Sequence, residues 1–218
     1  MRVLKTSVAL LFVLGSLATV AQAKSGFGLK LGGGAATLEG PASYKSGRNN
    51  VYQGGALFEY AAKPDLGVQI ELCYGQAGQW VDYGGGFEQR VTLNYVQLPI
   101  ALRMKATAVT GEHPYFVLGI QPGLYLSGAV ETLVGTTKLS TDPKYIDAFD
   151  LSSIVGFGGE FARGRQTFDI EARWTYSLLG IASATPVARP SDPIDLRNSV
   201  ISLALSYKFW PSGAPGAL

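Results

Sequence analysis

Hydrophobic and polar residues alternate with a period of two along Ser199–Trp210. The odd-numbered positions from Ile201 to Phe209 are apolar, and the even-numbered ones from Ser202 to Lys208 are polar or small. Successive side chains of a strand point to opposite faces, so this pattern predicts a strand with one apolar and one polar face. In a soluble sandwich the apolar face points inward, whereas in an outer-membrane barrel it points outward into lipid.

The same alternation recurs in seven further segments, which gives eight predicted strands. All are about 11 residues or longer, which suits a tilted membrane strand of about 9–11 residues better than a soluble strand of about 5–6. Pro99 and Pro122 each remove a backbone donor and predict a bulge or distortion. The seven segments are Gly26–Thr37, Val51–Ala61, Gly67–Gly78, Gln89–Lys105, Pro114–Ser127, Phe149–Phe161 and Thr167–Leu178.

The links between these segments alternate in length. The short links are Ala62–Leu66, Ala106–His113 and Ala162–Gln166, and the long ones are Leu38–Asn50, Gln79–Glu88, Gly128–Ala148 and Gly180–Arg197. Short turns on one side and long loops on the other are typical of bacterial outer-membrane barrels. We therefore predict an all-β fold: an eight-stranded antiparallel up-and-down transmembrane β-barrel, closed by pairing of its first and last strands.

The first 23 residues predict a secretory signal peptide. Arg2 and Lys5 make a positive start, Val8–Ala18 is apolar, and Ala21 to Ala23 form an A-x-A cleavage signal. The alternative, an N-terminal membrane anchor, is disfavoured by the short apolar run. The predicted organisation is signal peptide 1–23, barrel 24–210 and flexible tail 211–218. The predicted location is the outer membrane of a Gram-negative bacterium.

Removal of the signal peptide makes the chain neutral. The full sequence has 18 Lys and Arg against 16 Asp and Glu, and Arg2 and Lys5 are lost without any acidic residue, which leaves 16 against 16. A neutral chain gives no electrostatic argument for binding nucleic acid. The single cysteine, Cys73, permits no disulfide within the chain and is expected to be a packed thiol in the barrel interior.

Charged residues recur in mid-strand on the polar faces. In a soluble sandwich they would simply face water. An eight-stranded barrel, however, has an interior just wide enough for side chains, and buried charges are costly unless they are paired. We therefore predict a charge network that fills the interior and leaves no open pore. Its predicted members are Lys30, Glu59, Glu71, Arg103, Glu171, Arg173 and Lys208.

Aromatic residues sort into two predicted belts at the membrane interfaces, although ordinary strand aromatics are the alternative. The belt near the periplasmic ends comprises Phe27, Tyr60, Phe116, Phe161, Phe168, Phe209 and Trp210. The belt nearer the outer ends comprises Tyr52, Tyr74, Trp80, Phe149, Trp174 and Tyr176.

The sequence gives little support for catalysis. The only histidine, His113, lies in a predicted short turn, whereas an outer-membrane Ser–His hydrolase would need it in the outer half of the barrel. One histidine and one cysteine do not supply the usual zinc ligand sets. Paired carboxylates such as Asp169 and Glu171 are candidates for acid–base chemistry, but we expect a structural role. We predict no enzymatic activity, no cofactor and no metal site.

Several segments resemble the PorT-like outer-membrane β-barrel family. They are the glycine-rich first strand (FGLKLGGGAATL), Tyr95–Ile100 (YVQLPI), Pro114–Leu126 (PYFVLGIQPGLYL), Phe149–Phe161 (FDLSSIVGFGGEF) and Asp169–Ile181 (DIEARWTYSLLGI). The resemblance covers essentially the whole mature chain and implies a small eight-stranded integral outer-membrane domain, without implying one function. The chain departs from the usual pattern at Pro211–Leu218, which follow the last aromatic that the barrel-assembly machinery reads.

The favoured function is a non-enzymatic structural or interaction scaffold whose long loops face a ligand or partner, accessory to a secretion or envelope complex. Expected partners are the lipid bilayer of the outer membrane, the barrel-assembly machinery during biogenesis, and an envelope protein. Leu133, Tyr145 and Ile146 are candidate anchors for a partner in the loops. The alternative function is a barrel that binds or transports a small ligand, and a lipid-modifying enzyme is disfavoured.

Overall fold

The computed structural model describes residues 24–40, 47–106, 112–143, 146–181 and 195–212. None of these residues belongs to a helix long and apolar enough to cross a membrane. The described elements are strands: β1 (Lys24–Glu39), β2 (Asn49–Lys63), β3 (Leu66–Gly84), β4 (Phe87–Gln97), β5 (Ile100–Lys105), β6 (Glu112–Val134), β7 (Thr137–Thr141), β8 (Phe149–Arg163), β9 (Gln166–Ser177) and β10 (Arg197–Phe209).

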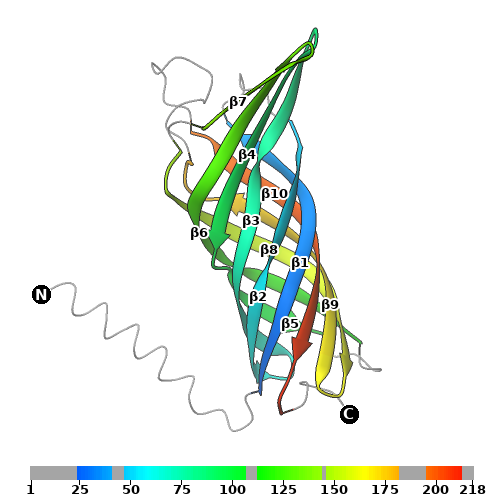
Figure 1. Cartoon of the computed structure of the whole chain (residues 1–218). Coiled ribbons are helices and arrows are strands. Elements are labelled where there is room, and N and C mark those ends of the chain that lie inside the picture. Colours follow the sequence, from blue (N-terminus) through cyan, green and yellow to red (C-terminus); the bar gives the residue numbers. More distant parts are fainter. Residues whose placement is uncertain (1–23, 41–46, 107–111, 144–145, 182–194, 213–218) are drawn as a thin grey trace, which may run out of the picture.

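The strands form one closed antiparallel ring (Figure 1). β1 pairs with β10 from Phe27 opposite Phe209 to Glu39 opposite Arg197, which closes the sheet as predicted. β4 and β5 share one position in the ring, because each pairs with β3 on one side and β6 on the other. The order around the ring is β1, β2, β3, β4 with β5, β6, β8, β9 and β10, so the prediction of an eight-stranded barrel is confirmed.

The break between β4 and β5 lies at Leu98 and Pro99, in agreement with the predicted distortion. The Pro122 carbonyl on β6 accepts the N–H of Leu98 at 2.9 Å. In an antiparallel ladder the N–H and C=O of one residue point to the same neighbour, so the missing N–H of Pro122 also faces the break. The two prolines therefore interrupt the ladder at one place.

The two ends of the barrel differ. At the turn end, two-residue turns join β2 to β3 and β8 to β9, and Gly164 in the second turn has a φ of 61°. At the extended end, the prediction of two long loops is wrong. Much of Gln79–Glu88 and Gly128–Ala148 is strand, because β3 continues to Gly84, β6 continues to Val134 and β7 follows. We call β7 and the adjoining ends of β3, β4 and β6 the protruding sheet (Figure 1).

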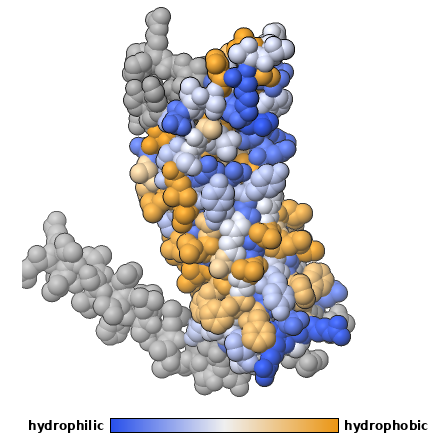
Figure 2. All heavy atoms as spheres, in the orientation of Figure 1, coloured by the Kyte–Doolittle hydropathy of each residue, from blue (hydrophilic) through white to orange (hydrophobic). Residues whose placement is uncertain are grey.

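The outward face carries a broad apolar band. Leu31, Phe157 and Leu205 are 70%, 69% and 60% exposed, respectively. Figure 2 shows apolar side chains over the middle and lower part of the visible face, with hydrophilic ones in the upper half and at the lower end. The alternation reverses towards that end: on β4, Val91 and Leu93 are buried inside while Arg90 is exposed.

Several predicted segments lie outside the described residues. These are the signal peptide 1–23, most of the Gly180–Arg197 link, Tyr145, and residues 213–218 of the tail.

Candidate functional site

The barrel interior at the turn end holds a buried cluster of three cations and three anions, the turn-end cluster. Arg103 lies 2.9 Å from Glu59, 2.9 Å from Asp169 and 3.1 Å from Glu160. Lys208 contacts the same three carboxylates at 2.5, 2.9 and 3.0 Å. Lys105 completes the cluster at 3.1 Å from Glu59 and 2.9 Å from Glu160. Its members come from five strands, so only the closed ring brings them together.

A second cluster, the mid-barrel cluster, pairs two cations with two anions. Lys30 Nζ lies 3.1 Å from Glu71 Oε1 and 2.7 Å from Glu171 Oε1. Arg173 Nη2 lies 2.6 and 2.8 Å from the same two oxygens. Because each cation contacts both anions, the four side chains form a compact ring of charges across the interior.

Gln69 and Tyr115 join the two clusters. Gln69 accepts a hydrogen bond from Arg103 Nη1 at 3.1 Å and donates one to Glu71 at 2.6 Å. The Tyr115 hydroxyl donates to Glu171 at 3.3 Å, and the Arg103 guanidinium lies 3.6 Å from the centre of the Tyr115 ring. The two clusters therefore belong to one continuous network.

Together the clusters hold five cations and five anions, none more than 7% exposed. All seven residues that the sequence assigns to an interior charge network lie in these clusters. Sequence reasoning missed Lys105, Glu160 and Asp169, although the alternation of β8 and β9 turns the last two inward. The charges balance, as burial in a narrow interior requires.

Trp210 lies inside the turn-end mouth, so its assignment to a lipid-facing belt is wrong. Its side chain is 0% exposed and packs with Ala61 and Ala162. Its indole N–H donates to Thr167 Oγ1 at 3.2 Å, and the Lys208 ammonium lies 5.7 Å from the ring centre. The physical reason is strand alternation, which turns Trp210 to the same side as Lys208.

The other aromatics of the two predicted belts lie on the outward-facing surface, at different heights. Towards the turn end, Phe27 pairs in register with Phe209 and Phe161 with Phe168. Trp80 differs from the rest, because it lies on the protruding sheet and its indole N–H donates to Glu88 at 3.2 Å. That these side chains mark membrane interfaces stays a prediction.

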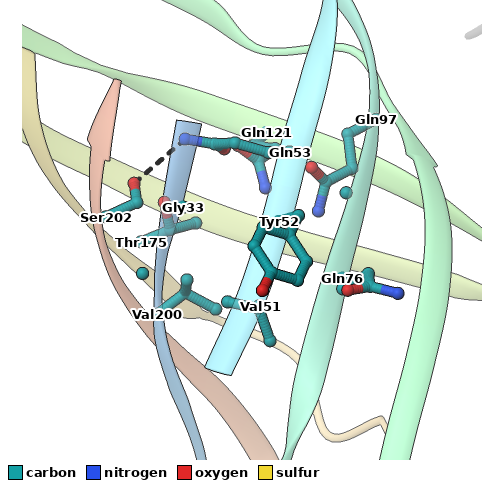
Figure 3. Close-up of a pocket in the computed structure, with 12 residues that line it drawn as sticks. Gly33, Val51, Tyr52, Gln53, Gln76, Gln97, Gln121, Thr175, Val200 and Ser202 are labelled. Atoms are coloured by element: carbon teal, nitrogen blue, oxygen red, sulfur yellow. Dashed lines mark hydrogen bonds between the residues drawn. The ribbon is translucent and has the colours of Figure 1, made fainter. Parts of the chain in front are cut away.

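An uncharged polar layer lies next to the mid-barrel cluster on its extended side. It surrounds a cavity of about 20 Å³ between several strands (Figure 3). Gln53 donates to Ser202 Oγ at 3.1 Å, but within the described residues the structure records no hydrogen bond for the side-chain amides of Gln97 and Gln121. The lining also includes Tyr52, Gly75, Gln76, Thr175 and Val200.

The interior near the extended end combines apolar side chains with a buried polar group, in which Ser177 and Asn198 donate hydrogen bonds to Asp150. We call the set Leu38, Ala77, Val91, Leu93, Tyr95, Val130, Ile181 and Leu196 the apolar cluster. Ile146, predicted as a loop anchor for a partner, packs against this cluster instead, so that prediction is wrong.

The protruding sheet offers a second candidate surface. Its outward side has a depression of about 170 Å³ lined by Trp80, Glu88, Arg90, Glu131, Leu133 and Lys138. All five residues of β7 are exposed, and among the described residues β7 pairs with β6 alone. The free edge of β7 therefore presents unpaired backbone donors and acceptors, which can pair with another chain.

The remaining candidates for chemistry are isolated. Cys73 is a buried free thiol, as predicted, with Sγ 3.6 Å from Glu71. His113 lies in β6 opposite Glu160, so its assignment to a turn is wrong. Across the part of the chain that the structure describes, no three His, Cys, Asp or Glu side chains are grouped to hold a metal ion.

A family model matches the chain, and several solved structures are similar to it. The model of a family described as outer membrane protein beta-barrel domain matches residues 20–183. Among solved structures, the chain is similar to neisserial surface protein A, with 13% identity over 84% of this chain and 97% of that chain and a TM-score of 0.48. Ail of Yersinia pestis is 13% identical over 85% of this chain and 99% of that chain, with a TM-score of 0.41. OprG of Pseudomonas aeruginosa is 16% identical over 85% of this chain and 97% of that chain, with a TM-score of 0.41. No curated protein matches the chain.

Proposed function

Because the chain belongs to the outer membrane protein beta-barrel domain family and is an integral protein of the Gram-negative outer membrane, we propose that it acts as a closed, non-enzymatic scaffold that presents the protruding sheet to a protein partner. The observation that carries this proposal is the interior, which a balanced network of buried ion pairs and the apolar cluster fill in succession. A filled interior favours a structural role over conduction.

The proposed orientation puts the turn end in the periplasm and the protruding sheet outside the cell. Short turns face the periplasm in bacterial barrels, and longer connections face outward. We further propose that the protein belongs to the PorT-like subfamily, is inserted by the barrel-assembly machinery and is an accessory to a secretion or envelope complex. The outward phase of β10, with Tyr207 and Phe209 exposed, supports recognition of the last strand during assembly.

The partner surface is the free edge of β7 with the apolar side chains beside it. Val134 and Leu139 are 50% and 57% exposed, outside the apolar band that the barrel presents to lipid. An extended peptide that added to this edge would bind through main-chain hydrogen bonds, and exposed apolar side chains such as Leu139 would supply further contact. Such a partner needs no catalytic group from the barrel.

Two measurements test the scaffold. In planar bilayers the purified protein should show no steady conductance; a large, steady conductance would overturn the closed interior. In cells, a photo-crosslinking residue in place of Leu139 should give a discrete protein adduct, and the same residue in place of lipid-facing Phe157 should give none. Equal labelling at both positions would contradict a partner at the protruding sheet.

A second candidate function, binding of a small ligand, is favoured by one observation, the cavity among the glutamines.

A further inference from the structure

The glutamine-lined cavity extends into the barrel wall between β2 and β3. Its lining includes inward-facing Gln53, Gln97 and Gln121, and also Tyr52 and Gln76, which lie on the outward-facing side of β2 and β3 (Figure 3). Residues of both faces therefore contribute to the lining, which places the space within the wall between β2 and β3.

A gap in the hydrogen-bonded ladder explains this placement. β2 and β3 pair only as far as Gln53 opposite Gly75. Beyond that point β2 continues beside β1 to Asn49, and β3 continues beside β4 to Gly84, without pairing to each other. The result is a window between Tyr52 and Gln76.

The window is bounded on its far side. The Asn49 side chain donates to Val91 O and Thr92 Oγ1, both at 3.4 Å, and so ties β2 to β4 across β3. The near side is closed by the pair of Gln53 and Gly75. The opening is therefore local rather than a general separation of two strands.

Both axial routes to the cavity are filled. On β9, the ion-paired Arg173 lies two residues to the turn side of Thr175 in the lining. On β4, Tyr95 of the apolar cluster lies two residues to the extended side of Gln97. A ligand therefore reaches the cavity from the side. The window adjoins the apolar band, where Leu72 and Tyr74 are 59% and 47% exposed.

We infer that the cavity binds one small uncharged polar group, a hydroxyl or a carboxamide, carried by an amphiphile whose apolar part stays in the membrane beside Leu72 and Tyr74. The size of about 20 Å³ admits a single water-sized group. The amides of Gln97 and Gln121 offer both donors and acceptors to such a group. No charged residue lines the cavity, so a charged head group would lack a counter-charge there.

The test is a nuclear magnetic resonance titration of the full mature chain in phosphocholine micelles with three probes: monolaurin, laurate and glycerol. The readouts are the Gly75 backbone amide and the Gln97 side-chain amide. Monolaurin should shift both and saturate at one equivalent. Laurate should bind at least tenfold more weakly. Glycerol should leave the resonances unmoved at the same concentrations, because it lacks the apolar part.

Two variants tie binding to the cavity. In Gly75→Ala the new Cβ would stand 2.3 Å from Gln97 Oε1, so the flexible amide must swing into the cavity and occlude it. Gln121→Leu removes a polar side chain from the lining. It should weaken the affinity for monolaurin by about tenfold, the loss expected for one well-made hydrogen bond. The matched control is Gly159→Ala on the outward face of β8, where the nearest atom is Phe161 at 3.8 Å. This control variant should leave the affinity for monolaurin unchanged.

Three results would overturn the inference. The first is no shift with monolaurin, which would leave a cavity that holds water only. The second is monolaurin binding that Gly75→Ala and Gln121→Leu leave unchanged. The third is glycerol binding as strongly as monolaurin, which would place the source of the polar group in water and remove the lateral route. None of these results bears on whether the protruding sheet binds a partner.

Discussion

The barrel interior changes character along its axis. Towards the turn end it is filled by charged groups such as Arg103 and Glu59, both 0% exposed, whereas towards the extended end Leu93 and its apolar neighbours predominate, beside one buried carboxylate, Asp150. The outward face changes in the opposite sense, from the apolar band to the mixed surface of the protruding sheet, where Arg90 and Lys138 are exposed as well as Leu139. The difference teaches that the surroundings decide which face of a strand is apolar. Lipid around one half and water around the other reverse the pattern within single strands.

The two halves are also held together by different forces. Breaking one buried ion pair leaves an uncompensated charge in a confined space, which is strongly destabilising even where the pair itself adds little net stability. The apolar cluster is stabilised by removal of its side chains from water. The stability lost when one of them is truncated therefore scales with the buried area and with the volume of the cavity left behind. A substitution therefore has a different cost in each half.

The largest effect should follow removal of Arg103. Arg103→Met leaves three carboxylates facing Lys105 and Lys208 alone, so the turn-end cluster gains a net negative charge. We expect the free energy of unfolding to fall by roughly 3–5 kcal/mol. Urea titration in lipid vesicles, followed by the heat-dependent shift in gel migration, measures it.

The paired variant distinguishes charge from lost volume. Arg103→Met combined with Asp169→Asn restores neutrality and should recover part of the lost stability. Arg90→Met, on the exposed outer face of β4, serves as the control and should stay within about 0.5 kcal/mol of the parent. A double variant no more stable than the single one would show that packing, rather than charge balance, governs this half.

A second prediction places one lysine on each half of the outer face. Leu205→Lys inserts a charge into the middle of the apolar band, between Leu31 and Ile170, and should cost about 2–4 kcal/mol. Asn50→Lys, exposed on β2 towards the extended end, should cost about 0–1 kcal/mol. The same vesicle titration compares them. Equal costs would mean that the polarity reversal does not mark the limit of the lipid.

Most of the barrel was predictable from the sequence because a period of two is a local property. Alternation locates the eight strands, and the strand lengths and alternating link lengths decide which face points inward and predict the closing pair of β1 and β10. The partners of each charge do not, because Lys105 meets Glu160 only through the register of β5, β6 and β8. Lys105 also ends its strand, where alternation has no following residue to support it.

Where structure and prediction differ, the phase of the strand outweighs the chemistry of the residue. The aromatic ring of Trp210 favours a lipid belt, but its even number puts it on the face of Lys208. The predicted loop Gln79–Glu88 hid two strand ends because the apolar phase reverses there. Val91 and Leu93 are apolar and inward, whereas Val96 is apolar and outward, and this switch within one segment was the available signal.

The smallest effect belongs to the protruding sheet. Lys138 lies 2.7 Å from Glu131, with the two side chains 59% and 33% exposed. Lys138→Ala should lower the free energy of unfolding by less than about 1 kcal/mol, and the difference should vanish near 1 M salt, because an exposed pair is weak and screened. Lys208→Met, which breaks buried pairs to the same kind of partner, should cost several times more at every salt concentration, since buried charges are little screened. Similar salt dependence for the two variants would show that water and ions reach the turn-end cluster, and the contrast between a sealed ionic half and a solvated sheet would fail.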